Sequence, residues 1–401
     1  MSTKGLQWLM PKSAQNKPPY QAQAESLPES FLPRSIAAKD WLLGVLAFLA
    51  LMGVTAGVGR LFMGLRDATT LSDGVSWGIW IGFDFGLIAF AGAGFTMAAV
   101  VHVFHLEQFH KALRPALLVG LLGYMAVLAL LVLDLGRWDR FYHFLLYFNL
   151  HSPLFEISWC VLLYSTVLMI EVSPDFLRFL PWKWPAKTAA AIIVPVSIIG
   201  VTLSTLHQST LGTLYLNMPY RLHPLWYTPI LPILFYVSSI MAGLSLGILA
   251  YLAACKLRGV KAEARIGAGL GKGLMWVAVV YAVLKVAELT WANEWALLGD
   301  GAYGLLWGTE MIVGVLLPIV LLSKAAWRRS VRVQIAAPLL VLSGVLMNRF
   351  DATLFGQILP EGAAYSPHIM EWMSTIGILA AAALAWMICV RFIVRDEEHA
   401  H

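Results

Sequence analysis

The sequence predicts an all-α polytopic membrane protein with about ten transmembrane helices. Of its 401 residues, 59% are hydrophobic and only 13% are charged, and the mean hydropathy is +0.73. A helix that spans a bilayer needs about 20 mostly apolar residues, and ten segments have this character. They cover residues 40–63, 77–103, 115–136, 152–172, 187–206, 229–255, 273–292, 305–323, 335–350 and 370–393. The polar stretches that remain are too short to form a soluble domain.

Residues 1–38 differ from the rest of the chain. They are rich in Pro, Gln, Ser and Lys and contain no apolar core. This composition predicts a flexible cytoplasmic segment and excludes a signal peptide. We expect residues 39–393 to form a single transmembrane domain, followed by a short cytoplasmic tail at 394–401.

Lys and Arg are distributed unequally between the two sides of the predicted helices. Of 28 such residues, 21 fall on the side of the N-terminus and six on the opposite side, while Lys285 lies within a helix. Cytoplasmic loops of membrane proteins carry the excess of Lys and Arg. Both termini are therefore predicted in the cytoplasm, and the connection between residues 134 and 156 faces outward.

The first two helices differ in polarity. Segment 40–63 carries no ionisable residue between Asp40 and Arg60, which indicates a peripheral, lipid-facing helix. Segment 77–103 contains three glycines spaced four residues apart, a pattern that lets neighbouring helices approach closely. It also contains Asp84, about 10 Å below the start of the helix. We expect this helix to pack through its glycines while Asp84 faces a pocket.

The connection between the third and fourth helices is unusually polar and aromatic. It has an acid at each end, Asp134 and Glu156, and between them it contains Arg137, Trp138, Tyr142 and His143. An acid within the bilayer costs at least about 2.5–3.5 kcal/mol, so two acids that flank one loop indicate a functional site. The alternative is that headgroups and water solvate acids near helix ends.

The fifth to seventh helices add further polar groups. Segment 187–206 brings His207 and Gln208 to the outer side, and loops as long as the one that follows are usually functional. Segment 229–255 contains no charge. Segment 273–292 contains Lys285 and Glu288 three residues apart and thus on one face. A self-neutralising pair and a functional pair are both open interpretations.

The last three helices are mostly apolar. The eighth brings Glu310 close to the outer surface, the ninth ends at Arg349 and Asp351, and the tenth is apolar up to Arg391. Asp134 and Glu156 are separated by the same number of residues as Glu288 and Glu310. This repeat predicts two four-helix bundles, made of helices two to five and six to nine, with the first and last helices at the periphery.

The ionisable groups within the predicted helices all fall in the outer third of the membrane: Asp84, Asp134, Glu156, His207, Lys285, Glu288 and Glu310. A transport pathway would show polar groups at several depths, particularly at the midplane. Acids, a histidine and aromatic residues at one depth suit a lipid-soluble substrate that gains and loses protons, such as a quinone. A proton-coupled secondary transporter that uses Lys285 and Glu288, and a purely structural anchor, are the alternatives.

The sequence indicates no redox centre of its own. Cys160, Cys255 and Cys389 lack the spacing of a cluster or zinc site, so we expect no metal. His102 and His207 lie at opposite ends of their helices, which argues against a pair of haem ligands. A partner must therefore bring electrons to the outer surface, and we expect no nucleic-acid partner.

Several motifs resemble the NrfD/polysulfide-reductase family of membrane subunits, in particular its hydrogenase-2 type. They are SWGIWIGFD at 76–84, RPALLVGLLGY at 114–124, LDLGRW at 133–138, N-x-x-S-P-L-F-E at 149–156, LHQSTLGTL at 206–214 and HPLW at 223–226. Their order and spacing agree along helices two to six. The run AGAG after Asp84 departs from the family pattern, and Lys285 and Glu288 have no clear counterpart.

The resemblance implies a ten-helix, haem-free protein of the bacterial cytoplasmic (inner) membrane, without an iron–sulfur cluster of its own. It would exchange electrons between menaquinone or ubiquinone and a ferredoxin-like iron–sulfur subunit docked on the periplasmic side. The catalytic subunit of such a complex is a nickel–iron hydrogenase, a molybdopterin enzyme or a multihaem cytochrome. The motifs favour the hydrogenase.

The predicted quinone site has three groups of residues. Those expected to bind or protonate the quinone are Glu156, His207 and Asp134. Those expected around it are Asp84, Arg137, Tyr142, His143 and Gln208, and those expected to form its apolar walls are Trp77, Trp80 and Trp138. His102, Tyr124, Tyr164 and Glu171 are either the start of a proton path from the cytoplasm or ordinary polar residues of helix ends and cores.

Overall fold

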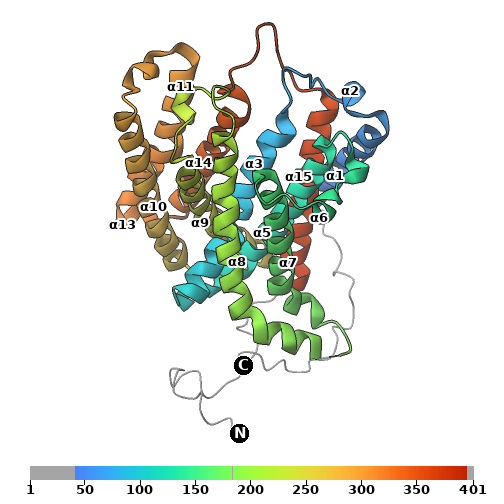
Figure 1. The fold of residues 1–401 in the computed structure, drawn as a ribbon. Coiled ribbons are helices and arrows are strands. Elements are labelled where there is room, and N and C mark those ends of the chain that lie inside the picture. Colours follow the sequence, from blue (N-terminus) through green and yellow to red (C-terminus); the bar gives the residue numbers. More distant parts are fainter. Residues whose placement is uncertain (1–40, 183, 395–401) are drawn as a thin grey trace, which may run out of the picture.

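The computed structural model describes residues 41–182 and 184–394, so the predicted segment 1–38 and nearly all of 394–401 lie outside it. In this part of the chain every regular element is a helix (Figure 1), apart from an isolated bridge between Leu222 and Gln357. Ten helical segments are long and apolar enough to cross a membrane. The all-α fold with ten membrane-spanning helices is confirmed.

The ten spans alternate in direction along the chain. They are α1 (Trp41–Met63); α3 (Ile79–Ala91), α4 (Ala93–Ala98) and η2 (Ala99–Val103) together; η3 (Glu107–Phe109) with α5 (His110–Asp134); α7 (Pro153–Leu177); α8 (Trp184–Leu216); α9 (Leu231–Arg258); α10 (Ala264–Trp291); α11 (Gly301–Met311), η7 (Ile312–Leu316) and α12 (Leu317–Ser323) together; α14 (Val331–Phe350) with η8 (Asp351–Phe355); and α15 (Ile369–Ile388) with η9 (Cys389–Ile393).

Short helices occupy the connections. They are α2 (Leu65–Ala68), η4 (Trp138–Arg140), α6 (His143–Leu146), η5 (Pro224–Trp226), η6 (Trp295–Gly299) and α13 (Ala325–Arg328). We call the end of the molecule that carries loops 64–78, 135–152, 217–230, 292–300 and 356–368 the upper end, as in Figure 1. The opposite end is the lower end.

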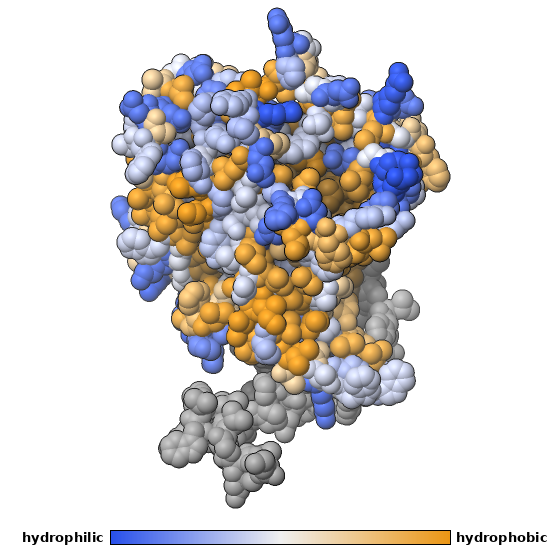
Figure 2. Space-filling model, in the orientation of Figure 1, coloured by the Kyte–Doolittle hydropathy of each residue, from blue (hydrophilic) through white to orange (hydrophobic). Residues whose placement is uncertain are grey.

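An apolar surface crosses the middle of the molecule on the face that Figure 2 shows, and hydrophilic residues gather at the upper end. This is the distribution expected of a multi-pass membrane protein. The cytoplasmic location of the lower end stays a prediction.

The fifth span is longer than the sequence indicated, because α8 continues to Leu216 instead of ending near residue 206. Ser and Thr usually favour loops. Here Thr205, Ser209, Thr210 and Thr213 each donate a hydrogen bond to the carbonyl four residues earlier, so they fit inside a helix. His207 consequently lies about 14 Å below the upper end of α8. The expectation that His207 stands at the end of the fifth helix is therefore wrong.

The fourth span also extends further than predicted and buries two acids near the lower end. α7 ends at Leu177, and Glu171 and Asp175 are only 5% and 7% exposed. Glu171 accepts a hydrogen bond from Ser197, and Asp175 Oδ2 lies 2.6 Å from Arg114 Nη1. The expectation that the ionisable groups within the helices all fall in the outer third of the membrane is therefore wrong.

The first and last spans pack against each other along the side of the molecule. Gly53 and Gly377 meet where α1 crosses α15, and a Cβ atom on either residue would overlap the backbone of the other. The crossing therefore requires glycine at both positions. Elsewhere α1 exposes large apolar side chains such as Phe48 and Phe62, which suits contact with lipid.

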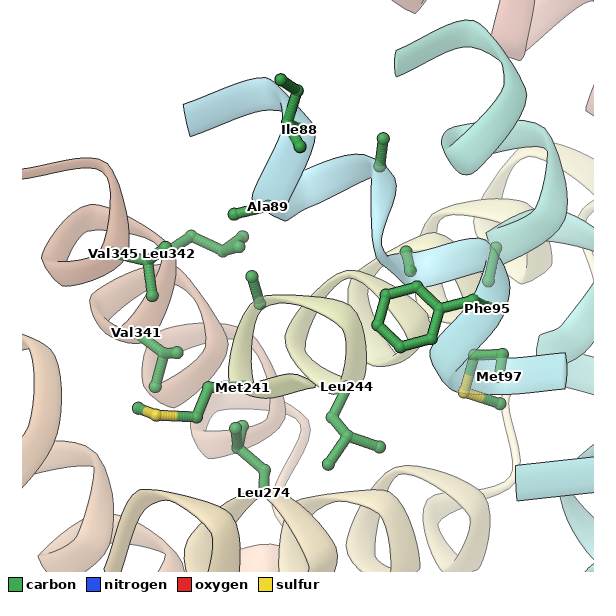
Figure 3. Packing of buried hydrophobic residues seen from close by; sticks show 14 of the residues in the cluster. Ile88, Ala89, Phe95, Met97, Met241, Leu244, Leu274, Val341, Leu342 and Val345 are labelled. Atoms are coloured by element: carbon green, nitrogen blue, oxygen red, sulfur yellow. The ribbon is translucent and has the colours of Figure 1, made fainter. Parts of the chain in front are cut away.

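Helix α9 lies at the centre of the molecule and has no charged residue before Lys256. Figure 3 shows it between α4 on one side and α10 and α14 on the other, with Met241 and Leu244 reaching into the packed core. A Cβ atom at Gly243 would collide with Thr96 of α4. Because α9, the sixth span, packs closely on both faces, it joins spans 2 to 5 to spans 7 to 9.

The second span is interrupted at Gly92, between α3 and α4. Gln208 Nε2 donates to the Ile88 carbonyl just above the interruption (2.8 Å), which ties it to α8. Below it, a Cβ atom on Gly120 of α5 would lie only 3.1 Å from Gly94 Cα. Four spans also contain π-helical segments, which are rare and frequently occur at functional sites.

Candidate functional site

A cavity of ≈ 480 Å³ lies at the upper end, between the start of α3, the loop after α8, η8, the loop 356–368 and the start of α15. Its walls include five aromatic side chains: Trp77, Phe350, Phe355, Tyr365 and Trp372. Arg221, Gln357, Thr353 and Ser76 add polar groups. Sites for small organic molecules have this size and this apolar lining with a few polar groups. We call it the upper cavity.

Tyr365 connects the upper cavity to a buried acid. Its hydroxyl donates to Glu371 Oε1 (2.6 Å) and accepts from the Ile79 N–H (2.8 Å). Burial, together with the hydrogen bond to Glu371, raises the pKa of the Tyr365 hydroxyl, which therefore keeps its proton at neutral pH. The cavity wall thus carries a proton donor that is bonded directly to a carboxyl group.

Glu371 is fully buried in the first turn of α15. Its Oε2 accepts from the His368 N–H (2.7 Å), which is one half of a capping box. Its Oε1 faces Gly78, where a Cβ atom would approach it to 2.8 Å. Because Gly78 has no Cβ atom, there is room for the Glu371 carboxyl group against the start of α3.

Three more charged residues lie behind Glu371, and two of them, Arg60 and Asp84, are buried. Arg60 of α1 is 1% exposed, and its Nη2 donates to the Leu135 carbonyl at the end of α5 (2.7 Å). Asp134 is close enough to interact electrostatically with Arg60 and Glu371, and Asp84 with Asp134. Within the described residues, nitrogen atoms of Arg60 and one oxygen of each aspartate have no hydrogen-bond partner. Buried polar atoms in this situation call for bound water or a catalytic role.

Two of the predicted tryptophans lie here but have different surroundings. Trp77 lines the upper cavity and contacts Tyr215 edge to face (5.9 Å between ring centroids). Trp80 is fully buried, packs on Leu130 of α5, and donates from Nε1 to Ser374 Oγ of α15 (3.0 Å). Trp80 therefore fixes α3 against α15 behind the cavity.

The sequence analysis missed three residues of this region: Arg60, Tyr365 and Glu371. Arg60 was only counted among the Lys and Arg residues of the outer side, although it lies inside the predicted segment 40–63 and inside α1. Glu371 was overlooked in a span described as apolar. A signal for it exists, since it is the acid in the first turn of α15 and follows His368 at capping-box spacing.

Glu156, His207 and Gln208 lie elsewhere, along α7 and α8. Glu156 Oε1 accepts from Thr210 (2.8 Å) near the upper end. His207 is fully buried against the ring of Tyr124 (5.8 Å between centroids), and neither ring nitrogen has a hydrogen-bond partner in the described residues. These groups do not line the upper cavity.

Further buried polar groups lie below His207, between it and the lower end of the molecule. Tyr164 lies edge to face with Tyr124 (5.1 Å), and its hydroxyl has no partner in the part of the chain that the structure describes. Glu171 with Ser197 and Asp175 with Arg114 follow along α7. Polar groups therefore occur at every depth of the fourth span.

The remaining predicted residues belong to the exposed loop 135–152. Arg137 forms an ion pair with Asp139 (2.8 Å), and its hydrogen bond holds the pKa of the Asp139 carboxyl down to about 2. Trp138 donates to the Leu61 carbonyl (3.2 Å), and the rings of Tyr142 and His143 lie edge to face. The structure thus places these four residues on the surface, away from the lining of the upper cavity.

A family model described as polysulphide reductase, NrfD matches residues 67–361, which include spans 2 to 9. The chain belongs to this family. The resemblance of the sequence motifs is thereby confirmed, and the match covers most of the residues that line the upper cavity.

Relatives within the family align over most of the chain. A protein of Nitratidesulfovibrio vulgaris is 36% identical over 360 residues, 87% of this chain and 92% of that protein. The probable Ni/Fe-hydrogenase 2 b-type cytochrome subunit of Escherichia coli is 29% identical over 343 residues (84% and 87%). The integral membrane subunit of menaquinone reductase from N. vulgaris is 26% identical over 389 residues (88% and 90%).

The described histidines of this NrfD-family chain do not fit a bis-histidine haem site, in which two ligands face each other across one gap. Two histidines are buried, His207 and His223. His207 lies deep in α8, whereas His223 lies at the upper end, stacked on Tyr303 (4.3 Å) and 3.2 Å from Asp300. Each is packed against a tyrosine ring and not against the other.

Proposed function

We propose that this chain is the quinone-reactive integral membrane subunit of a respiratory oxidoreductase complex. The observation that carries the proposal is the aromatic upper cavity whose Tyr365 is bonded to the buried Glu371. A quinone ring and the start of its apolar tail fit a cavity of this volume and lining. The membrane subunit of a menaquinone reductase among the relatives supports the same substrate class.

The residues around the cavity supply the proton chemistry that a quinone needs. Each two-electron interconversion of quinone and quinol moves two protons, so the site requires donors near the ring and a route to water. Tyr365 exchanges a proton with Glu371, and Asp134 and Asp84 take it further into the protein. The buried Arg60 stabilises negative charge on Asp134. The electrons come from a partner protein, and we propose that this chain holds neither haem nor an iron–sulfur cluster.

Other residues assigned from the sequence keep roles in this proposal. Glu156 and His207 exchange protons with the site along α7 and α8, and Gln208 holds the interrupted second span in place. Arg137, Trp138 and Tyr142 are exposed at the same end, and the half-buried His143 lies beside Tyr142. Their exposure suits contact with a docked partner.

The partner is an iron–sulfur subunit bound at the upper end, which we place on the periplasmic side because Lys and Arg are concentrated in the lower loops. The hydrogenase relative from E. coli favours a nickel–iron hydrogenase complex. A molybdopterin or multihaem complex is the alternative. Helix contacts among spans 2 to 5 and among spans 6 to 9 support two four-helix bundles within one transmembrane domain, residues 39–393.

A second candidate function has its own observation. A row of polar groups runs across the membrane from the exposed Glu156, through the buried His207, to the buried Asp175, so polar groups are not missing at the midplane. Transfer of protons along this row would make quinone turnover electrogenic. Proteoliposomes that develop a membrane potential during turnover, and lose it in His207→Ala, would support this function.

The first test is purification of the complex from its native membrane, followed by measurement of bound quinone. The variant Phe355→Ala removes a ring from the cavity wall and should lower the amount of bound quinone. Phe148→Ala is the matched control, because Phe148 is a similarly exposed ring at the upper end but outside the cavity. Equal quinone content in both variants, or no quinone in the native complex, would refute the assignment of the cavity.

A further inference from the structure

A second group of buried charges lies in spans 7 to 9, and the proposed quinone chemistry does not use it. It consists of Lys285 of α10, Glu310 of α11, Arg349 of α14 and Asp351 of η8, each no more than 3% exposed. None of them lines the upper cavity. A buried charge is costly unless it is paired and hydrogen-bonded, so the partners of each group decide its charge state.

Glu310 is surrounded by donors. Its Oε2 accepts from Trp226 Nε1 (3.1 Å), and its Oε1 accepts from the Tyr281 hydroxyl (3.2 Å) and Asn348 Nδ2 (3.1 Å). Lys285 Nζ lies 3.7 Å from Oε1. Hydrogen bonds and a cation are the surroundings that stabilise a carboxylate. Glu310, and not Glu288, is thus the buried acid with which Lys285 forms an ion pair.

Arg349 has only neutral partners among the described contacts. It donates to Asn348 Oδ1 (2.5 Å), to the Phe235 carbonyl (3.2 Å) and to Ser238 Oγ (2.8 Å), and its guanidinium lies 3.6 Å from the centre of the Phe235 ring. Without Asp351, the group therefore contains two cations, Lys285 and Arg349, and one carboxylate, Glu310.

Asp351 has the opposite surroundings. Its side chain is fully buried, and neither carboxyl oxygen has a hydrogen-bond partner in the described part of the chain. The titratable groups that interact with it electrostatically are Lys285 and Tyr281 of α10 and Glu310 of α11, and Arg349 lies two residues before it in the chain. An anionic Asp351 would neutralise the excess positive charge, whereas the lack of donors favours the neutral acid. The two effects oppose each other, which is the condition for a group that gains and loses a proton.

Asp351 is also connected to the upper cavity through the backbone. It begins η8, and Thr353, Leu354 and Phe355 of the same π-helical segment line the cavity. At the end of this segment the Gly356 N–H donates a hydrogen bond to the Asp351 carbonyl (2.7 Å). A ligand that shifts the cavity side of η8 therefore shifts the residue that carries the carboxyl group.

We propose that Asp351 is a proton-binding site, separate from the acids behind the upper cavity, and that filling the cavity changes its proton occupancy. The link to the cavity rests on the proposed function, whereas the proton site itself does not. Because binding free energies are reciprocal, a proton on Asp351 in turn changes the affinity of the cavity for its ligand.

The test is infrared difference spectroscopy on the purified native complex, which detects the C=O stretch of a protonated carboxyl group directly. We expect a band at neutral pH that shifts in D₂O, is lost in Asp351→Asn and is retained in Glu310→Gln. Asn is a neutral isostere of the protonated acid, so this variant should assemble. The D₂O shift is measured on the native protein and needs no variant. A spectrum without a shifting band, or one in which Asp351→Asn leaves every shifting band in place, would overturn the proton site.

The link to the cavity is tested by adding a menaquinone analogue to the same sample. We expect the intensity of the Asp351 band to change when the analogue binds. An unchanged band with bound analogue overturns the link. If the analogue does not bind at all, the proposed function of the cavity fails, while the proton site is still decided by the first measurement.

Discussion

Replacement of Tyr365 by Phe is the most direct perturbation of the proposed quinone site. The change removes one hydroxyl group and leaves the ring in the cavity wall, so the shape of the cavity is kept. Two hydrogen bonds are lost, to Glu371 and from the Ile79 N–H. A buried donor left without a partner costs about 1–3 kcal/mol, which is the expected loss of unfolding free energy.

The effect on turnover should be larger than the effect on stability. Proton transfer by a positioned side chain contributes about 10²–10⁴-fold to a rate, and Tyr365 is the hydroxyl that joins the cavity to Glu371. We expect quinone reduction by the purified complex to fall by about this factor, while quinone still binds because the aromatic walls are intact.

The matched control is Tyr227→Phe. Tyr227 is also a partly buried tyrosine at the upper end, and its hydroxyl donates to the Leu216 carbonyl (3.4 Å) outside the cavity. Turnover is measured with a reduced artificial electron donor and a short-chain quinone, alongside thermal unfolding of each variant. Turnover of Tyr365→Phe close to that of Tyr227→Phe would refute the role of Tyr365 in proton transfer.

Three further predictions concern other parts of the chain. Glu156→Gln should abolish electron transfer to quinone while the complex still assembles, and normal quinone reduction would remove Glu156 from the mechanism. Gly377→Leu should lower the free energy of unfolding by about 1–3 kcal/mol, because it overpacks the α1–α15 crossing. Gly44→Leu is the control and should not lower it, because no atom lies within 4 Å of the Gly44 Cβ position. Equal thermal stability of the two variants would contradict this prediction. The hydrogen bond from Lys111 lowers the pKa of Glu263 at the lower end. The ionised Glu263 therefore stabilises the fold by about 0–1 kcal/mol at neutral pH, and this stabilisation is lost as the pH falls through the lowered pKa. If the free energy of unfolding of Glu263→Gln has the same pH dependence in acid as that of the native protein, the prediction is wrong.

The ten spans could be predicted from the sequence because a bilayer demands continuous apolar length, and hydropathy measures that directly. The end of α8 could not, because its Ser and Thr residues resemble a loop until their hydroxyl groups are seen to bond to the helix backbone. Because α8 continues to Leu216, His207 lies within the helix and not at its end, as the sequence indicated.

The candidate site was predicted in part. Asp84, Asp134, Trp77 and Trp80 do gather at the upper end, since they begin or end neighbouring helices. Glu371 joins them from a helix that is remote in the sequence, through the contact of α15 with α3 and α5. The pairing of Lys285 with Glu310 was missed for the same reason, because periodicity along one helix indicates only partners on that helix.

Helix α9 carries no charged residue above Lys256, and this has an electrical consequence. It stands between the polar residues of spans 2 to 5 and the charged group of spans 7 to 9, and it contributes hydrocarbon and small side chains to both. A change of charge on one side would have to act through this apolar layer or around its ends. If both groups bind protons as proposed, α9 separates the two proton sites at mid-depth, and in the described part of the chain η8 and Tyr365 bring them together by lining the same upper cavity.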